Sequence, residues 1–582
     1  MRIEERLWGK NVEDLKALIR LLSGPGPEGT RKEFLIRSIV EHLTRPGSLE
    51  ELWESLDPLS QKAVAAAYHN DGKLDKKAFA ARYGRLPARK SNGRLYSYRR
   101  EPIPLDLFIY HDELPQELIP LLASFVPPPE KFRLQGLTKA PEEIKARGER
   151  LPLLRTDTER AGLHDLEAYL RLFRQGALKH GVTSSRLTPS SARTLLENLL
   201  DGDFFPPDDP ERVKFKDTIR PFGLDVFVRG SGLIQNHYRS ELSDEGEALL
   251  DAFETWTSQG HFDELSRITA IKGQGAKRTR LTPPAERREA IVEALSWCPA
   301  HVWISVTDFM RALEIWQFDF DLDRSDFSGL YMGDSTYGLL DYAGSEGWSL
   351  AKRLYVNAVL WEYLGSIGAL DLLYLPPEEA GLEFDYSHDE YFSPYDGLLY
   401  FRINPLGAYL LGQADEYVPS YPIDDPLFSV DPELVLTLKD PDALTPNLHG
   451  LLGQFAAEQD REHYRLDTQR VLTTLESGGE LEHISDFLAR RHEGPLPTRV
   501  TDWLQEIEES THAFQSAGTA LLVRARSQAM LKLVAEDPVL GKFVHTLGGR
   551  TLAIPANKEK AFRERLKDLG YLPPQTASAR RY

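Results

Sequence analysis

The chain has 582 residues, too many for one compact core, and its length predicts roughly two to four domains. Its formal net charge is -19, which excludes a general attraction to nucleic acid, so any DNA contact has to come from local basic patches. The single cysteine, Cys298, excludes an intramolecular disulfide framework and makes a thiolate metal cluster implausible, and its apolar surroundings predict a buried structural thiol.

Residues 1–48 predict a hairpin of two short helices. Apolar residues recur at helical spacing over 12–22, the pattern stops at SGPGPEG, and it resumes after Thr30, a helix N-cap residue type. The arrangement resembles a SAP-type helical hairpin, a small DNA-binding unit, with Arg31 and Lys32 where that motif often carries a basic residue. The loop is longer than the motif expects, so a plain helical hairpin is the favoured interpretation.

Residues 49–126 predict a helical, winged-helix-like unit with a basic loop. The loop RLPARKSNGRLYSYRR has six Arg or Lys residues and no acid, and two tyrosines are interleaved with them. Basic side chains beside aromatic rings suit phosphate and base contact, whereas the alternative interpretation is a solvated loop. The predicted DNA-binding residues here are Arg89, Lys90, Arg94, Tyr96, Tyr98, Arg99 and Arg100. Residues 127–160, rich in proline and charge, predict a linker.

Residues 161–282 predict a first full winged helix. SSARTLLENLL is typical of an amphipathic helix, a short strand pair is expected around Asn236, and DEGEALLDAF predicts a closing helix. The following segment KGQGAKRTR is basic, and we predict DNA contact through Lys277, Arg278 and Arg280. It lacks the GxxxxGK[ST] pattern of a phosphate-binding loop.

Residues 283–426 predict a second winged helix more clearly. PAERREAIVEAL, SVTDFMRALE and LAKRLYVNAVLWEYLGSIG predict three helices, ALDLLYL and LLYFRIN alternate as strands, and PLGAYLLG closes the unit. The wing over 376–397 carries seven acids and no Lys or Arg, and the insertion FDFDLDRSDF is acidic as well, so both surfaces would repel a phosphate backbone. We therefore predict protein contact here, through Glu378, Glu379, Glu383 and Asp385.

Residues 427–582 change to a mixed pattern of helices and strands. HYRLD, ALLVRA and TLAIP predict strands, and three successive helices are expected over TQRVLTTLES, LEHISDFLARR and PTRVTDWLQEIEE. The predicted fold class is therefore mostly α with small β-hairpins, in which tandem winged helices precede an α+β domain.

The order of predicted helices and strands in residues 427–582 resembles that of a known family. The stretch HYRLDTQRVLTTLESGGELEHISDFLARRHEGPLPTRVTDWLQEIEE, followed by ALLVRA, TLAIP and LKDLGYLPP, is similar to the N-terminal domain of the DNA translocase named for xeroderma pigmentosum type B (XPB) and to its bacterial helicase-associated relatives. The similarity covers roughly the last 150 residues, and the preceding winged helices match only in architecture. In this setting Trp503 is expected to anchor a core or a partner interface, with the core favoured.

The departure from that family is the absence of a motor. A helicase needs a nucleotide-binding loop and an acidic motif for magnesium, and the sequence has neither. The resemblance therefore implies a partner of a translocase, or a stand-alone derivative, without ATP hydrolysis by this chain.

Residues able to do chemistry are sparse. The triplets at His111 to Glu113 and His388 to Glu390 could hold a metal, but adjacent residues do not converge on one ion along a regular element. We therefore predict no catalytic residue, no metal site and no cofactor. The favoured hypothesis is a cytoplasmic, non-catalytic scaffold that contacts DNA and a helicase, translocase or nuclease partner, with no membrane association. The alternatives are a metal-dependent nuclease and a winged-helix transcription regulator.

Overall fold

The computed structural model describes the chain as two compact units, Met1–Ser429 with Leu436–Glu493, and Val430–Val435 with Gly494–Tyr582. It describes residues 2–573 except 23–28, 88–101, 147, 182–185, 207–211, 235–245, 261, 276–279, 325–328, 333–343, 381–391, 422–425, 442–443, 445 and 513–518. The division at Glu493 and Gly494 falls inside the last predicted domain. The five boundaries between the six predicted ranges stay predictions.

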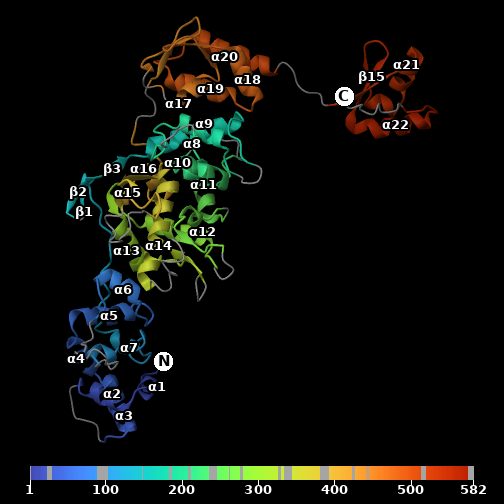
Figure 1. The fold of residues 1–582 in the computed structure, drawn as a ribbon. Coiled ribbons are helices and arrows are strands. Elements are labelled where there is room, and N and C mark those ends of the chain that lie inside the picture. Colours follow the sequence, from blue (N-terminus) through green and yellow to red (C-terminus); the bar gives the residue numbers. More distant parts are fainter. Residues whose placement is uncertain are drawn as a thin grey trace. The chain divides into compact units, whose positions relative to one another are not determined.

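The N-terminal helices pack around a single apolar core (Figure 1). They are α1 (Ile3–Trp8), α2 (Val12–Ile19), α3 (Lys32–Thr44), α4 (Ser48–Glu54), α5 (Pro58–Tyr68), α6 (Lys76–Tyr83), the 3-10 helix η1 (Pro104–Leu107) and α7 (Ile119–Leu122). The core extends from Ile3 to Val126, so the predicted hairpin and the predicted second unit share it. Helix α3 begins after Arg31, and the expected cap Thr30 lies one residue outside it.

Sequence-local capping explains where many helices begin. The Asp57 carboxylate accepts hydrogen bonds from two amides of the first turn of α5, and Pro58 fills the first helical position, where no amide is needed. Asp75 caps α6 and Ser305 caps α13 (Val306–Trp316) in the same way. These caps fix helix starts independently of the long-range packing.

The central part of the first unit contains most of the helices. They are α8 (Glu159–Arg174), α9 (Pro189–Asn198), η3 (Phe215–Asp217), α10 (Arg220–Gly230), α11 (Gly246–Ser258), η4 (Glu264–Arg267), α12 (Pro284–Ser296), α13, α14 (Gly344–Ala358), the π-helix η5 (Val359–Gly365), α15 (Pro377–Ala380) and α16 (Pro405–Leu410). One continuous apolar core joins them from Leu134 to Leu410. The two winged-helix ranges predicted as separate domains thus share this central core.

A four-stranded sheet closes the central core, in the order β3-β7-β8-β5. Its strands are β3 (Leu154–Thr156), β5 (Trp303–Ser305), β7 (Leu370–Tyr374) and β8 (Leu398–Ile403), all antiparallel to their neighbours. Four further strands form two separate two-stranded sheets. They are β1 (Glu143–Ala146) with β2 (Glu149–Pro152), and β4 (Ile271–Lys272) with β6 (Tyr331–Met332). The segment 127–160, predicted as a linker, therefore contains a hairpin and one strand of the sheet.

The remaining elements lie between Phe428 and Asp568. They are β9 (Phe428–Val430), β10 (Val435–Leu438), α17 (Pro446–Leu452), β11 (Ala456–Glu458), β12 (His463–Leu466), α18 (Thr468–Glu476), α19 (Leu481–Arg491), α20 (Thr498–His512), β13 (Ala520–Arg524), α21 (Gln528–Glu536), η7 (Leu540–Lys542), β14 (His545–Leu547), β15 (Thr551–Pro555), η8 (Ala556–Lys558) and α22 (Glu559–Asp568). Two sheets form here, β11-β12-β10-β9 and β13-β15-β14. Gly494, at a φ of 83°, lies in the turn between α19 and α20.

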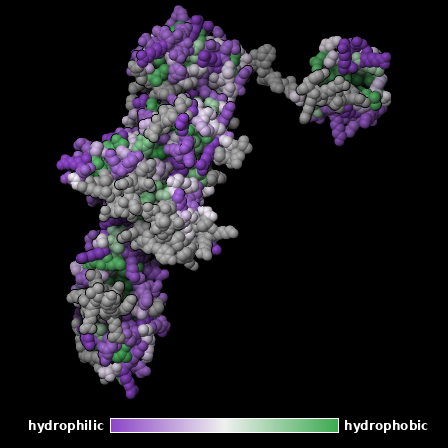
Figure 2. Space-filling view, in the orientation of Figure 1, coloured by the Kyte–Doolittle hydropathy of each residue, from purple (hydrophilic) through white to green (hydrophobic). Residues whose placement is uncertain are grey.

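The described chain is predominantly helical with small antiparallel sheets, which confirms that part of the predicted fold class. Hydrophilic side chains cover most of the coloured surface in Figure 2, and the hydrophobic patches between them are small. Among the described helices, none combines the length and apolar character that crossing a bilayer requires.

Candidate functional site

The third helix of the second predicted winged helix is the most deeply buried segment of the central core. Every residue from 354 to 375 is buried, which covers the end of α14, all of η5 and all of β7. Helix α10, the 3-10 helix η4 and strand β7 contact this segment. A helix that is enclosed in this way presents no free face to a DNA groove.

An ion pair between Arg267 and Glu362 joins the 3-10 helix η4 to the π-helix η5. Arg267, at the end of η4, donates three hydrogen bonds to the Glu362 carboxylate: from Nε at 2.8 and 2.9 Å, and from Nη2 at 2.7 Å. Burial by itself lowers the pKa of Arg267, but the adjacent Glu362 carboxylate outweighs it and raises the pKa above its ordinary value. Burial and the charge of Glu362 raise the pKa of Tyr395, so its hydroxyl keeps the proton that it donates to Glu362.

The two arginines of α12 are buried and form ion pairs with acids of the preceding segment. The Nε atom of Arg288 donates to Glu264 at 2.6 Å, and Tyr355 donates to the other oxygen of that carboxylate at 2.9 Å. Burial raises the pKa of Glu264, and the charge of Arg288 opposes this effect. Arg287 lies 2.8 Å from Asp263 and is fully buried. The described ionisable groups at the centre of this core thus hold elements together.

The predicted acidic partner surface is described only in part. Glu378 is exposed and Glu379 is half-buried, both on α15, whereas Glu383 and Asp385 lie outside the described residues. Asp396 was expected to contribute charge to the wing, but it is buried and accepts hydrogen bonds from the Phe392 amide and the Ser393 hydroxyl. That carboxylate closes a turn and adds no surface charge.

The predicted DNA-binding residues fall almost wholly outside the described part of the chain. Those outside it are Arg89, Lys90, Arg94, Tyr96, Tyr98, Arg99, Arg100, Lys277 and Arg278. Arg280 is described and exposed, and its amide donates to Asp323 at 3.0 Å. Its guanidinium group therefore extends from a backbone position that is fixed by hydrogen bonding.

Trp503 and Cys298 are buried, and the first acidic triplet lies in a hairpin turn. Trp503 on α20 is only 4% exposed, which leaves little of its indole accessible to a partner. Cys298 is buried, as predicted, and burial raises the pKa of its thiol. His111 and Asp112, both at positive φ, form the turn of a hairpin in which Tyr110 pairs with Glu113. The second triplet, at His388, lies outside the described residues. Within the residues that the structure describes, no group of His, Cys, Asp or Glu side chains is placed to hold a metal ion.

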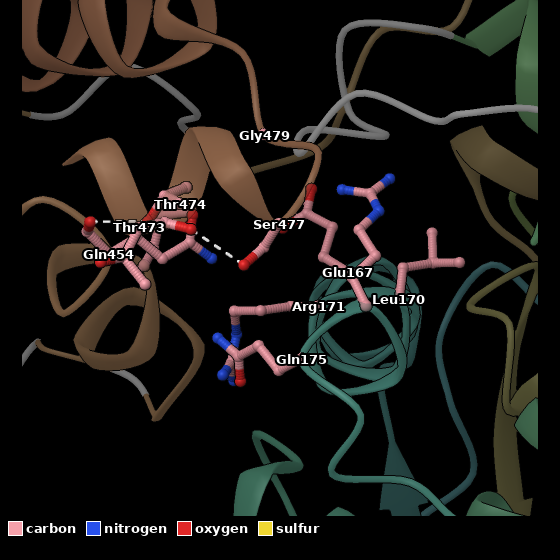
Figure 3. Close-up of a pocket in the computed structure, with 11 residues that line it drawn as sticks. Glu167, Leu170, Arg171, Gln175, Gln454, Thr473, Thr474, Ser477 and Gly479 are labelled. Carbon is pink, nitrogen blue, oxygen red and sulfur yellow. Dashed lines mark hydrogen bonds between the residues drawn. The ribbon is translucent and has the colours of Figure 1, made fainter. Parts of the chain in front are cut away.

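A cleft of about 220 Å³ lies between α8 and the segment from Leu451 to Gly479 (Figure 3). Its lining residues are Glu167, Leu170, Arg171, Arg174, Gln175, Leu451, Gln454, Thr473, Thr474, Ser477 and Gly479. The hydroxyls of Thr474 and Ser477 donate to backbone carbonyls at 2.8 and 2.9 Å, so they offer oxygen lone pairs to the cleft. Burial lowers the pKa of Arg171. The charge of the cleft is mixed, and we assign no ligand to it.

Sequence reasoning missed the buried charges of the central core. Arg287 and Arg288 stand in the run AERREA, which has the composition of a solvated helix face. The partner of Arg288 is 24 positions away, and the partner of Arg267 is 95 positions away. No local pattern identifies such pairs, because they depend on tertiary packing.

No family model matches the chain, and a search of curated proteins finds no match.

Proposed function

We propose that the protein is a non-catalytic, helicase-associated scaffold in DNA transactions. It contacts DNA through local basic patches, and it holds a translocase or nuclease partner through its acidic winged helix and its C-terminal domain. The fold assignments that belong to this proposal are a winged helix over 283–426, a winged helix over 161–282 and an XPB-like domain over 427–582.

The order of elements after Pro284 supports the winged-helix assignment. From Pro284 to Ile403 the chain runs α12, β5, α13, β6, α14 with η5, β7, α15 and β8; the sheet places β8 between β5 and β7, and β6 pairs with β4 outside this sheet. A helix, a strand, two helices and a two-stranded wing, with the first strand beside the last, is the order of the winged-helix fold. The additional strand β3 extends the sheet at β7.

The burial of η5 and of the last residues of α14 carries the scaffold interpretation. A winged helix that reads DNA presents its third helix to the major groove, whereas here every residue from 354 to 375 is buried. The surrounding acids Glu378 and Glu379 would repel phosphate as well. This copy therefore serves packing and partner contact, and DNA contact is left to the basic segments.

A salt titration of DNA binding tests the proposal. We expect the intact chain to bind a short labelled duplex by fluorescence anisotropy, with an affinity that falls as salt rises. Replacing Arg94, Arg99 and Arg100 together by alanine should weaken binding about tenfold and lower the slope of log affinity against log salt by roughly two to three.

A charge-matched triple variant is the control. Arg461, Arg465 and Arg526 are exposed arginines far from the basic loop in sequence, and their replacement by alanine removes the same charge. Equal loss in both triple variants, or no DNA binding at low salt, would overturn the DNA-contact part of the proposal. Cleavage of the duplex on addition of magnesium would instead favour the nuclease alternative.

A comparative pull-down tests the partner. The intact protein and a version that lacks residues 427–582 are each incubated with native lysate, and the bound proteins are identified by mass spectrometry. We expect a helicase or nuclease only with the intact chain. Recovery of the same proteins by the truncated version would contradict docking through the last domain.

A further inference from the structure

The outer face of α12 is acidic along its whole length and ends in an exposed tryptophan. Glu286, Glu289, Glu293 and Trp297 recur at a spacing of three or four positions, and all four are exposed. The two arginines of this helix are buried, so they do not neutralise the outer face. Glu286 is already paired with Arg324. Within the described part of the chain, Glu289 and Glu293 make no ion pair.

Trp297 belongs to a cluster of aromatic rings from three segments. Its ring centroid lies 5.8 Å from that of Trp316 and 5.1 Å from that of Phe318, both in edge-to-face geometry. Phe132 contacts Trp316 from the other side, with centroids 5.9 Å apart. Trp316 and Phe318 are half-buried against the central core, so Trp297 packs on the edge of that core while its own side chain stays exposed.

Trp297 is the most exposed indole of the protein, since all nine tryptophans lie in the described residues. Its exposed fraction is 56%, compared with 47% for Trp8. The Trp8 ring is partly covered, because the Lys32 ammonium lies 5.5 Å from its centroid. Leaving a large aromatic surface in water is unfavourable, and tryptophan is enriched at the centres of protein interfaces.

Two lysines near Phe318 are engaged within the fold. The ammonium group of Lys352 lies 2.6 Å from Asp319 and 3.6 Å from Asp321, and its side chain is 10% exposed. Lys77 lies 3.8 Å from Asp319 as well. Glu289 and Glu293 therefore have their negative charge available to an incoming molecule, beside an aromatic ring that attracts cations through its face.

We propose that Glu289, Glu293, Trp297, Trp316 and Phe318 form a docking face for a segment of a partner protein. That segment carries an apolar anchor residue that packs on Trp297, flanked by lysine or arginine residues that pair with the two glutamates. The inference deepens the proposed scaffold function and rests on it, because it locates partner contact on the winged-helix unit. A nucleic-acid ligand is disfavoured by the charge of the face.

Binding of a synthetic probe tests the docking face. The probe is a fluorescein-labelled peptide of about 15 residues, with leucines at helical spacing of three and four and lysines at the other positions. Fluorescence anisotropy is measured with the full chain at about 50 mM and about 300 mM salt. We expect saturable binding that weakens at the higher salt, and no binding of a peptide with glutamate in place of lysine.

Two variants of the face are compared with two matched controls. Trp297→Ala should weaken peptide binding at least tenfold, and Trp8→Ala should leave it unchanged. Charge reversal by Glu289→Lys with Glu293→Lys should weaken binding further. The control is Glu50→Lys with Glu54→Lys, which changes two exposed glutamates at the same spacing on α4.

Equal binding by wild type and both variants of the face overturns the inference, as does an equal loss in the matched controls. Concentration-dependent self-association in sedimentation velocity that Trp297→Ala abolishes also overturns it, in favour of a second copy of this chain as the occupant. The peptide assay contains no DNA, so failure of the docking face and failure of the DNA-contact proposal are distinguishable.

Discussion

The central core and the C-terminal sheet place their charged groups differently. In the central core, Glu362 and Glu264 are fully buried and each is paired with an arginine. In the C-terminal unit the ion pair of Asp537 with Arg565 joins a buried carboxylate to an arginine whose side chain is 32% exposed. The central core therefore depends on complete pairs, since removal of one partner leaves a charge in an apolar setting.

The two regions differ in how the loss of one charge should affect their stability. The partners of the central pairs are 24 and 95 positions apart in sequence, so each pair forms only when distant segments have packed. Asp537 and Arg565 are 28 positions apart and join α22 to the end of α21. Sequence separation therefore does not distinguish the two regions. They should respond differently to loss of a charge because the Arg565 side chain is 32% exposed, compared with 10% for Arg267 and 2% for Arg288.

Removal of Glu362 should have the largest effect. Glu362→Ala leaves the buried Arg267 guanidinium without its carboxylate and should lower the free energy of unfolding by about 3–5 kcal/mol. Urea unfolding can be followed by thiol labelling of Cys298, the single cysteine, which is buried in this core. The control Glu289→Ala, at an exposed position, should change stability by less than about 0.5 kcal/mol.

A double variant sharpens this prediction. Glu362→Leu combined with Arg267→Met removes both charges, so it should cost less than Glu362→Ala alone. If the single and double variants lose the same stability, the cost arises from packing rather than from an unpaired charge. A loss below about 1 kcal/mol in Glu362→Ala would contradict the prediction.

A methyl group at Gly223 should have the next largest effect. Helix α10 approaches η5 so closely that a Cβ at Gly223 would overlap the Glu362 carbonyl oxygen. Gly223→Ala should therefore separate the two elements and cost about 1–3 kcal/mol in the same unfolding assay. Gly260→Ala is the control, because a Cβ there meets nothing within 4 Å. Equal stability of the two variants would contradict the close approach.

Local patterns predicted several elements of the central core well. PAERREAIVEAL and SVTDFMRALE were expected as helices, and α12 and α13 occupy those positions. The segment 127–160 was predicted as a linker because its pairing is not local: Thr156 and Tyr374, on adjacent strands, are 218 positions apart. Apolar periodicity and caps report on neighbours along the chain, whereas such a strand is defined by its distant partner.

The same limit applies to the candidate surfaces. The acidic character of the second winged-helix range was readable from composition, but the sequence did not indicate that Arg287 and Arg288 point inward and leave α12 acidic outside. Trp297 precedes Cys298 in the sequence, where the apolar surroundings favour burial, yet its side chain is exposed. Its exposure depends on how the helix ends pack, which single-sequence patterns do not encode.

Loss of the Asp537 pair should have the smallest effect and should depend on pH. Hydrogen bonds, first from the Arg565 side chain and then from backbone amides, lower the pKa of Asp537 to about 2 from 3.8. Because the folded pKa is the lower one, this contribution is complete above about pH 4 and is lost as pH falls toward 2. Arg565→Met should raise the Asp537 pKa and move that loss to higher pH.

Carbon-13 detected titration of the carboxyl groups measures the Asp537 pKa directly, and hydrogen exchange at the amides of β15 reports stability in the same unit. Arg563→Met is the control, since Arg563 lies on the same helix and pairs with Glu559 rather than Asp537. Titration of wild-type Asp537 at its ordinary value would refute the prediction. A small, pH-dependent change here beside a large one at Glu362 would show that the C-terminal unit tolerates loss of a charge that the central core does not.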